Sequence, residues 1–477
     1  MISFVCCLLV LICGYIFYGR FIERVMRVDS KRETPAYRLQ DGVDFIPLPT
    51  WKVFMIQFLN IAGLGPIFGA IMGVKFGSAS FIWIVLGSIF AGATHDFIAG
   101  MLSLRHHGEN LPEMIGRYLG KNFKWFMRAF TVLAMILVGA VFISTPAGLL
   151  ANLTPEHLDI NFWIAIIFIY YIVATLLPID KIIGKIYPAF AVAILFMALG
   201  ILVMMLIKQP QIPELWHNLG NQHPDNLPIF PIMFVSIACG AISGFHATQS
   251  PLMARCLKSE TMGRPVFYGA MIVEGAVALI WAAAATYYYQ ENGMTETNPA
   301  VIVNTITRDW LGVVGGLLAV LGVVFAPIST GDTSLRAARL IVGDFLHIDQ
   351  KKIGKRLLIS IPIFLACLGL LLYSIKDKEG FEIIWRYFAW TNQTMSVFTL
   401  WALSVYMVYT RRIVWVTLIP ALFMTFVCSC YIFIAPEGLS LSANMSQLLG
   451  GIVTLVLLLF FLRWVIKNKK GRDVISS

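Results

Sequence analysis

Several ionisable side chains lie inside long apolar stretches, where a charge is costly and usually serves a function. His95 and Asp96 are adjacent in A-G-A-T-H-D-F, and Glu274 lies in G-A-M-I-V-E-G with no basic residue near it in its own stretch. Asp332 has Arg336 four residues later, a spacing that places both side chains on one face of a helix. Because a carboxyl group in a low-dielectric environment can hold a proton near neutral pH, these side chains are candidates for carrying a coupling proton.

Hydroxyl groups around Asp332 offer a different kind of ion site. Ser329, Thr330, Thr333 and Ser334 provide oxygen atoms that, together with carbonyl groups of a broken helix, suit a sodium ion. Both ions remain open at this point, with a proton preferred. The expected coupling-ion residues are Glu274, Asp332, His95, Asp96, Thr330 and Thr333.

A structural role is the alternative for two of these groups. Asp332 and Arg336 would then form an ion pair near the cytoplasmic surface, and His95 and Asp96 a hydrogen-bonded pair that holds the loop after them. For Glu274 we favour a function, because its own stretch contains no basic partner.

Two apolar stretches contain clusters of helix breakers. Residues 60–69 read N-I-A-G-L-G-P-I-F-G, and residues 239–251 read C-G-A-I-S-G-F-H-A-T-Q-S-P. Glycine lowers helix stability by about 1 kcal/mol and proline by about 3 kcal/mol, so both helices are expected to break. Close helix packing is the alternative use of such glycines.

A broken helix inside a membrane exposes backbone groups that can bind a solute. Unpaired N–H groups at the start of a half-helix favour an anion such as a carboxylate, and unpaired carbonyl groups favour a cation. We therefore expect the solute between the two breaks, with two polar residues of the stretch 383–409 nearby. The candidate solute-binding residues are Asn60, Gly63, Gly65, Pro66, Gly240, Ser243, Gly244, His246, Asn392 and Gln393.

The overall composition is that of an integral membrane protein. Hydrophobic residues make up 58% of the 477 residues and charged residues 13%, against roughly 25% charged residues in soluble proteins. The net charge of +10 does not indicate nucleic-acid binding, because the basic residues lie in short loops between apolar runs. The eight cysteines include no C-x-x-C, and no nucleophile elbow or phosphate loop occurs, so we expect no metal site, no cofactor and no enzyme activity.

The hydropathy pattern predicts an all-α, polytopic protein with about thirteen transmembrane helices. The first apolar run lacks the basic start and the cleavage site of a signal peptide, so it is interpreted as a retained helix. The runs 311–340 and 383–409 are long enough to be tilted or broken. The expected spans are 1–19, 53–74, 78–104, 123–150, 161–180, 185–208, 229–250, 266–289, 311–340, 355–373, 383–409, 412–435 and 445–466.

The basic residues predict the orientation in the membrane. If the N-terminus lies outside, 30 of the 36 Lys and Arg residues fall on the cytoplasmic side and 6 on the other. This agrees with the excess of basic residues in cytoplasmic loops. The C-terminus is then cytoplasmic.

The two clusters of breakers occupy matching places, each at the start of a unit of five helices. Because five is odd, the two units face opposite ways, as in LeuT-like transporters with a five-plus-five inverted repeat and two discontinuous helices. The expected division is 1–50, an extra helix and cytoplasmic linker; 51–210, the first repeat; 229–410, the second repeat; and 411–477, two helices and a basic tail.

Six segments together resemble the carbon starvation (CstA) family of bacterial transporters. They occur in the family's order and cover about residues 50 to 410. They are N-I-A-G-L-G-P-I-F-G (60–69), G-A-T-H-D-F (92–97) with R-H-H-G-E-N-L (105–111), C-G-A-I-S-G-F-H-A (239–247), R-P-V-F-Y-G-A-M-I-V-E-G (264–275), D-T-S-L-R-A-A-R (332–339) and T-N-Q (391–393).

This resemblance implies a function and a cellular place. The family is grouped with the amino acid–polyamine–organocation superfamily and is associated with proton-coupled uptake of pyruvate or small peptides during carbon starvation. The chain is then expected to be a multi-pass secondary active importer in the bacterial inner membrane. It departs from the family where a His-His pair precedes the first break, since Ile56 and Gln57 stand there, and where larger members carry a C-terminal extension.

Other functions remain open on the sequence alone. An uncoupled channel or facilitator could use the same breaks to line a pore. A sodium-coupled amino acid or carboxylate transporter could use the hydroxyl groups near Asp332.

Overall fold

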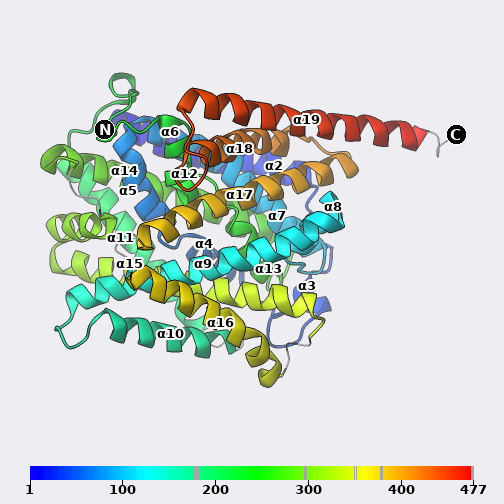
Figure 1. Ribbon diagram of the computed structural model, residues 1–477, viewed down its shortest axis with the longest axis horizontal. Coiled ribbons are helices and arrows are strands. Elements are labelled where there is room, and N and C mark those ends of the chain that lie inside the picture. The colour runs from blue at the N-terminus through cyan, green and yellow to red at the C-terminus, as the bar shows by residue number, and fades with distance from the viewer. Residues whose placement is uncertain (177–182, 295–297, 349, 351, 377–379, 474–477) are drawn as a thin grey trace.

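A computed structural model describes residues 1–176, 183–294, 298–348, 350, 352–376 and 380–473, and within these ranges the chain is helical without a strand (Figure 1). Helices satisfy their own backbone hydrogen bonds, which is what a chain in lipid requires. The helices up to residue 208 are α1 (Ile2–Cys13), α2 (Gly19–Met26), α3 (Pro35–Arg38), α4 (Thr50–Ile61), α5 (Ala70–Gly73), α6 (Ala79–Leu86), α7 (Ala93–Arg105), α8 (Leu111–Leu119), α9 (Lys121–Leu153), α10 (Ile160–Leu176) and α11 (Ile183–Lys208).

The second half of the chain is also helical. Short helical turns continue some helices into others: Gly14–Tyr18 joins α1 to α2, Gly87–Gly92 joins α6 to α7, and Arg264–Gly269 leads into α14. The helices after residue 208 are α12 (Phe234–Ile237), α13 (His246–Ala254), α14 (Ala270–Asn292), α15 (Pro299–Phe345), α16 (Ile353–Lys376), α17 (Gly380–Tyr409), α18 (Trp415–Ile434) and α19 (Ala443–Asp473).

Every predicted span coincides, over its described residues, with a helix or with a broken helix pair; the end of the span 161–180, residues 177–180, lies outside them. Among the described residues, 8 helices are long and apolar enough to cross a membrane, and 2 bent pairs raise this number to 10. The shorter apolar helices Ile160–Ala174 and Ile229–Gly240 correspond to two further predicted spans. The total of about thirteen spans stays a prediction.

Of the two long runs, one is bent and one is not. Within α15, Pro299–Leu317 and Gly322–Phe345 meet at an angle of 59°. In contrast, α17 continues as a single helix from Gly380 to Tyr409.

Both clusters of helix breakers interrupt their helices, as predicted. α4 ends at Ile61, and the chain resumes as a π-helical turn at Gly65–Gly69 before α5, with a 52° change of direction. In the second cluster, the turn Ala238–Gly240 ends the first half-helix, and α13 begins at His246. The backbone between these two points is not helical, which leaves its N–H and carbonyl groups free for other partners.

The two broken helices cross in antiparallel directions, with the breaks in contact. α4 packs on α13 and α5 on α12, so the first half of one helix lies beside the second half of the other. A Cβ atom on Gly65 would lie only 2.2 Å from the Cβ atom of Cys239. Glycine is therefore required at this position by the close approach of the two breaks.

The other helices surround this crossing. α9, α11 and α16 pack along or beside α15, while α1 lies against α6 and α14. α19 packs on α18 at the edge of the molecule and projects beyond the other helices at its C-terminal end (Figure 1). The boundaries of the four predicted parts of the chain stay predictions, and the last four residues of the expected tail lie outside the described residues.

Candidate functional site

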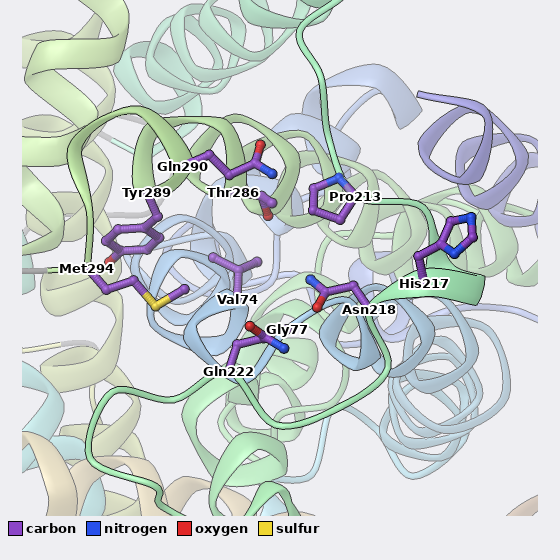
Figure 2. A pocket seen from close by; sticks show the side chains of 10 residues that line it. All are labelled: Val74, Gly77, Pro213, His217, Asn218, Gln222, Thr286, Tyr289, Gln290 and Met294. Atoms are coloured by element: carbon purple, nitrogen blue, oxygen red, sulfur yellow. The ribbon is translucent and has the colours of Figure 1, made fainter.

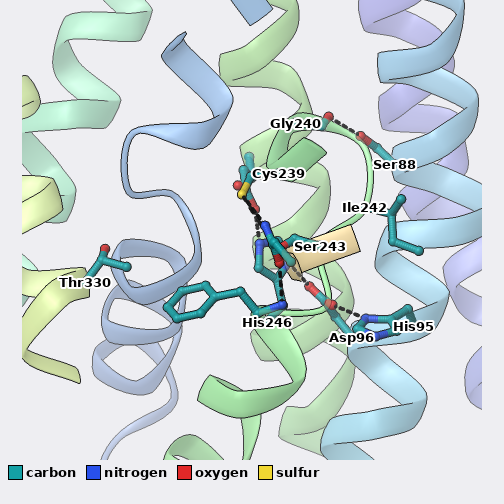
Figure 3. A network of polar contacts seen from close by, with 12 residues as sticks. Ser88, His95, Asp96, Cys239, Gly240, Ile242, Ser243, His246 and Thr330 are labelled. Carbon is teal, nitrogen blue, oxygen red and sulfur yellow. Dashed lines mark hydrogen bonds and ion pairs between the residues drawn. The ribbon is translucent and has the colours of Figure 1, made fainter. Parts of the chain in front are cut away.

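Four ionisable side chains form a continuous chain at the second break; Figure 3 labels three of them, His95, Asp96 and His246. His95 and Asp96 come from α7, His246 is the first residue of α13, and Glu274 lies on α14. The Asp96 carboxylate contacts the Nδ1 atoms of His95 and His246, each at 2.8 Å, through its two different oxygen atoms. On the far side of His246, its Nε2 atom lies 3.5 Å from Oε2 of Glu274.

This chain is closed off from solvent and incompletely hydrogen-bonded. All four side chains are fully buried. Neither carboxyl oxygen of Glu274 has a hydrogen-bond partner among the described residues, nor does Nε2 of His95 or His246. The gap of 3.5 Å between His246 and Glu274 exceeds a normal hydrogen bond. A small approach of the two groups would let a proton pass between them.

The second break is held in place by Asn392 of α17. Its Oδ1 atom accepts hydrogen bonds from the Ser243 hydroxyl at 2.9 Å and from the Phe245 N–H at 2.7 Å. Its backbone carbonyl accepts from the N–H of Gly244 at 3.2 Å. The next residue, Gln393, donates from Nε2 to the carbonyl of Ile242 at 2.9 Å. Asn392 and Gln393, expected at the solute, thus contact the break itself in this conformation.

The first break offers polar groups of a different kind. The side-chain amides of Asn60 and Gln57 are buried and have no hydrogen-bond partner among the described residues. Thr330 of α15 donates to the carbonyl of Leu59 at 3.1 Å, and a Cβ atom on Gly63 would lie 3.1 Å from its hydroxyl. Thr330 therefore borders the first break, whereas His246 and Asp96 lie at the second (Figure 3).

Asp332 and Thr333 belong to a separate group of contacts. Asp332 accepts a hydrogen bond from the Tyr187 hydroxyl at 2.5 Å, and Thr333 donates to carbonyl groups of its own helix. Arg336 donates to the carbonyl of Ala174 at 2.6 Å. The six expected coupling-ion residues therefore fall into two sets, one around Asp96 and one along α15.

Three site neighbours were missed by the sequence reasoning. Cys239 borders the break, and its Sγ atom lies 3.3 Å from Nδ2 of Asn392. Tyr187 faces Asp332, and Gln57 lies one turn before the first break. Of the three, only Gln57 could have been recognised from the sequence, as a polar residue in an apolar stretch. Cys239 and Tyr187 reach the site through tertiary packing, which the sequence does not display.

A cavity of about 350 Å³ lies at the end of the first broken helix (Figure 2). It is formed where Val74 and Gly77 meet the loop around Asn218 and the last turns of α14 at Gln290. The described residues of its polar lining carry no carboxylate or ammonium group. The predicted orientation places these three segments on the outer side, which makes the cavity a candidate outer mouth.

The carbon starvation protein CstA family matches the chain over residues 1–157, 152–315 and 300–430. A protein of Haemophilus influenzae described as an uncharacterized membrane protein is 40% identical over 61% of this chain and 92% of its own length. The peptide transporter CstA of Campylobacter jejuni is 27% identical, over 86% of this chain and 76% of its own. The pyruvate/proton symporter BtsT of Escherichia coli is 28% identical, over 58% of this chain and 48% of its own.

Solved transporter structures share the fold. A manganese transporter of Eremococcus coleocola, in a mutant form with one histidine replaced by alanine, superposes with a TM-score of 0.55 at 13% identity, over 91% of this chain and 99% of its own. Another structure of that transporter, in complex with an aromatic bis-isothiourea substituted compound, gives a TM-score of 0.54 at 15% identity, over the same shares of the two chains. The likeness, together with the crossing of two broken helices, confirms the predicted transporter fold with discontinuous helices. The chain is a multi-pass secondary transporter rather than an enzyme, and it belongs to the carbon starvation protein CstA family.

Proposed function

We propose that this protein imports a small carboxylate, pyruvate or a small peptide, together with protons across the bacterial inner membrane. Its N-terminus would lie outside and its C-terminus in the cytoplasm, as the distribution of basic residues indicates. The observation that carries the proposal is the buried chain from His95 through Asp96 and His246 to Glu274 at the second break. Such a chain of titratable groups at the midpoint of a transporter suits proton relay.

The solute is proposed to bind where the two breaks touch. The unpartnered amides of Asn60 and Gln57 supply hydrogen-bond donors beside the first break. The start of α13 supplies the partial positive charge of a helix N-terminus, which favours a carboxylate. Pyruvate needs little more than this anion site, so it is placed first. A peptide also needs a group for its amine, and Glu274, whose carboxyl oxygens have no hydrogen-bond partner among the described residues, is proposed for that role.

Solute and proton transport would be coupled if the protonation of Glu274 changed the affinity of the site for the solute. A proton on Glu274 removes a buried negative charge beside His246, which lowers the electrostatic cost of an incoming anion. The solute then enters with its proton, and neither is released until the crossing opens to the other side. An empty site without the proton repels the anion.

The proposal is tested by uptake into proteoliposomes that contain the purified protein. An inward proton gradient should drive labelled pyruvate above its outside concentration, and a protonophore should abolish this accumulation. Unlabelled di- and tripeptides should compete if peptides share the site. Equilibration without accumulation would instead indicate a facilitator.

The Glu274→Gln variant separates coupling from binding. It should lose accumulation driven by the proton gradient but keep exchange of labelled for unlabelled solute, because exchange needs no net proton movement. Glu109→Gln is the matched control, since that carboxylate is partly exposed and pairs with Arg117 away from the site. Full gradient-driven accumulation by Glu274→Gln would refute the proton role.

Sodium coupling is the second candidate, supported by Thr330. Its hydroxyl lies at the first break and contacts the carbonyl of Leu59, so hydroxyl and carbonyl oxygen atoms are already together. Uptake that follows a sodium gradient at equal pH on both sides would favour this candidate. Thr330→Val should then abolish the sodium dependence, whereas under proton coupling it should leave the proton dependence intact.

A further inference from the structure

A second cavity, of about 580 Å³, lies between the end of α2 and the loop that joins α17 to α18. Its lining includes the four arginines Arg24, Arg27, Arg411 and Arg412 and, as far as the structure describes the chain, no carboxylate. All four belong to segments that the distribution of basic residues places on the cytoplasmic side. A concave surface with this much positive charge attracts an anion.

Two carboxylates near the cavity, Glu23 and Glu260, are engaged with basic groups outside its lining. Glu23 pairs with Arg264 at 3.1 Å. Glu260 is fully buried and pairs with Arg32 at 2.6 Å and Arg105 at 2.9 Å. These contacts leave the positive charge of the cavity without compensation from its own lining.

Arg412 is the most constrained member of the group. Its Nη1 atom donates to the carbonyl of Met26 at 2.7 Å, which ties the loop to the end of α2. Its Nε atom is buried and has no hydrogen-bond partner among the described residues. Burial in the first place, and the nearby Arg105, Arg27 and Arg32, lower its pKa, against the opposite effect of Tyr406. An anion in the cavity could accept a hydrogen bond from this Nε atom and would stabilise the charged form of Arg412.

Two of the arginines occupy positions that glycine would fill with less strain. Arg27 has a φ of 49° and Arg411 a φ of 51°, both in the left-handed region. A residue with a Cβ atom is uncommon there and costs roughly 1–2 kcal/mol in this conformation. Arginine at these two helix ends therefore strains the backbone more than glycine would, which is consistent with a function for the two positive charges.

The remaining lining is apolar, and exposed apolar side chains lie further along the same two segments of the chain. Phe21, Val25 and Ile413 complete the cavity. Beyond it, Phe17 on the N-terminal helix is 70% exposed, and Ile419 on α18 is 61% exposed. A soluble anion would gain nothing from this apolar continuation, whereas the acyl chains of a lipid would cover it.

We propose that this cavity binds the phosphate headgroup of an anionic phospholipid of the cytoplasmic leaflet. The four arginines hold the phosphate, and the acyl chains lie along the N-terminal helix and α18. Basic pockets between transmembrane helices on this side of a membrane commonly bind such headgroups. The bound lipid bridges the N-terminal helix to the α17–α18 loop and stabilises their contact.

The test uses the purified full-length protein in a neutral detergent, titrated with phosphatidylglycerol, phosphatidylcholine or inorganic phosphate. Native mass spectrometry counts retained lipid, and thermal unfolding reports stabilisation. Phosphatidylglycerol should be retained and should raise Tm in a saturable way, with at least a tenfold lower half-saturating concentration than phosphatidylcholine. Equal effects of the two lipids would overturn the proposal. Equal stabilisation by inorganic phosphate alone would show a soluble-anion site and overturn it as well.

Variants locate the effect. Arg24→Gln with Arg411→Gln should weaken phosphatidylglycerol binding at least tenfold, since each arginine near an anionic lipid strengthens binding about fivefold. The matched control is Arg38→Gln with Arg463→Gln, which removes the same charge at exposed positions outside the cavity. If the double variant does not fold, the Arg→Lys pair at the same positions replaces it and should retain most of the binding. Equal binding by the cavity and control variants would refute the site.

Discussion

The contact between the two breaks can be tested by adding a single methyl group. In Gly65→Ala, the new Cβ atom would lie 2.2 Å from Cβ and 2.5 Å from Sγ of Cys239. Ordinary contacts of this kind are 3.4–4 Å long. The two breaks must therefore separate by about 1.2 Å, the difference between 3.4 and 2.2 Å, or one must change conformation.

This displacement has an expected energy. Adding a methyl group to a well-packed core typically costs about 1–3 kcal/mol. If the strain falls on the closed conformation that holds the solute, affinity should decrease by about 5- to 150-fold. If it falls on all conformations equally, Tm should decrease instead. Either effect requires the contact seen between Gly65 and Cys239.

The assay combines thermal unfolding with solute uptake in proteoliposomes, and a second substitution gives the decisive comparison. Cys239→Gly removes both atoms that the new methyl group would meet. The pair Gly65→Ala with Cys239→Gly should therefore regain uptake relative to Gly65→Ala with Cys239→Ala, which keeps the Cβ atom. Cys239→Gly alone measures the loss of the Asn392 contact. Gly369→Ala is the neutral control, because nothing lies within 4 Å of its added Cβ atom.

Three results would refute the reasoning. Wild-type stability and uptake in Gly65→Ala would show that the breaks are not in contact in the working protein. Equal uptake by the two double variants would show that the damage from Gly65→Ala does not come from Cys239. Loss of uptake in all glycine variants, including Gly369→Ala, would indicate general fragility and would equally reject the specific contact.

Three further predictions concern other parts of the molecule. Asn392→Ala should lower the free energy of unfolding by about 2–4 kcal/mol, because it leaves buried donors of the second break without a partner; a Tm equal to that of wild type would contradict this role. Asn60→Ala should weaken solute binding about tenfold without lowering Tm, since its amide has no partner among the described residues to lose; reduced Tm with unchanged binding would show a structural role. Partial burial disfavours the ionised form of Glu113, but hydrogen bonds from Lys124 and Arg128 outweigh this effect and lower its pKa below 4.5. The ionised carboxylate therefore stabilises the fold above pH 4.5, and this stabilisation is lost as the pH falls through the lowered pKa. Thermal unfolding between pH 3 and 6 should show a smaller acid-induced decrease of Tm in Glu113→Gln than in wild type, and an equal decrease would contradict this role.

The sequence predicted the position of both breaks because their cause is local. Glycine and proline at positions such as Gly65 and Pro66 disfavour the helix wherever the chain places them. That the two breaks would face one another was expected from their matching places in two units of opposite orientation. These features depend on composition and spacing, which a sequence displays directly.

The partners of the polar side chains could not be predicted in the same way. Asp96 and His246 are 150 residues apart, and their contact depends on how α7 packs against α13. The contacts of Asn392 with the break were not predicted, because a buried amide takes whichever donors and acceptors the packing brings near it; its expected role at the solute stays a prediction. Asp332 meets Tyr187 for the same reason, although its neighbour in sequence suggested Arg336.

Each break is tethered to a different long helix, and this has a mechanical consequence. The turn at Ser243–Phe245 is fastened to α17, while the carbonyl of Leu59 is fastened to α15. A tilt of α17 relative to α15 would pull the two turns in different directions and part them at the place where they touch. Movement of the two surrounding helices would then be enough to open the site, and the half-helices could move as rigid bodies.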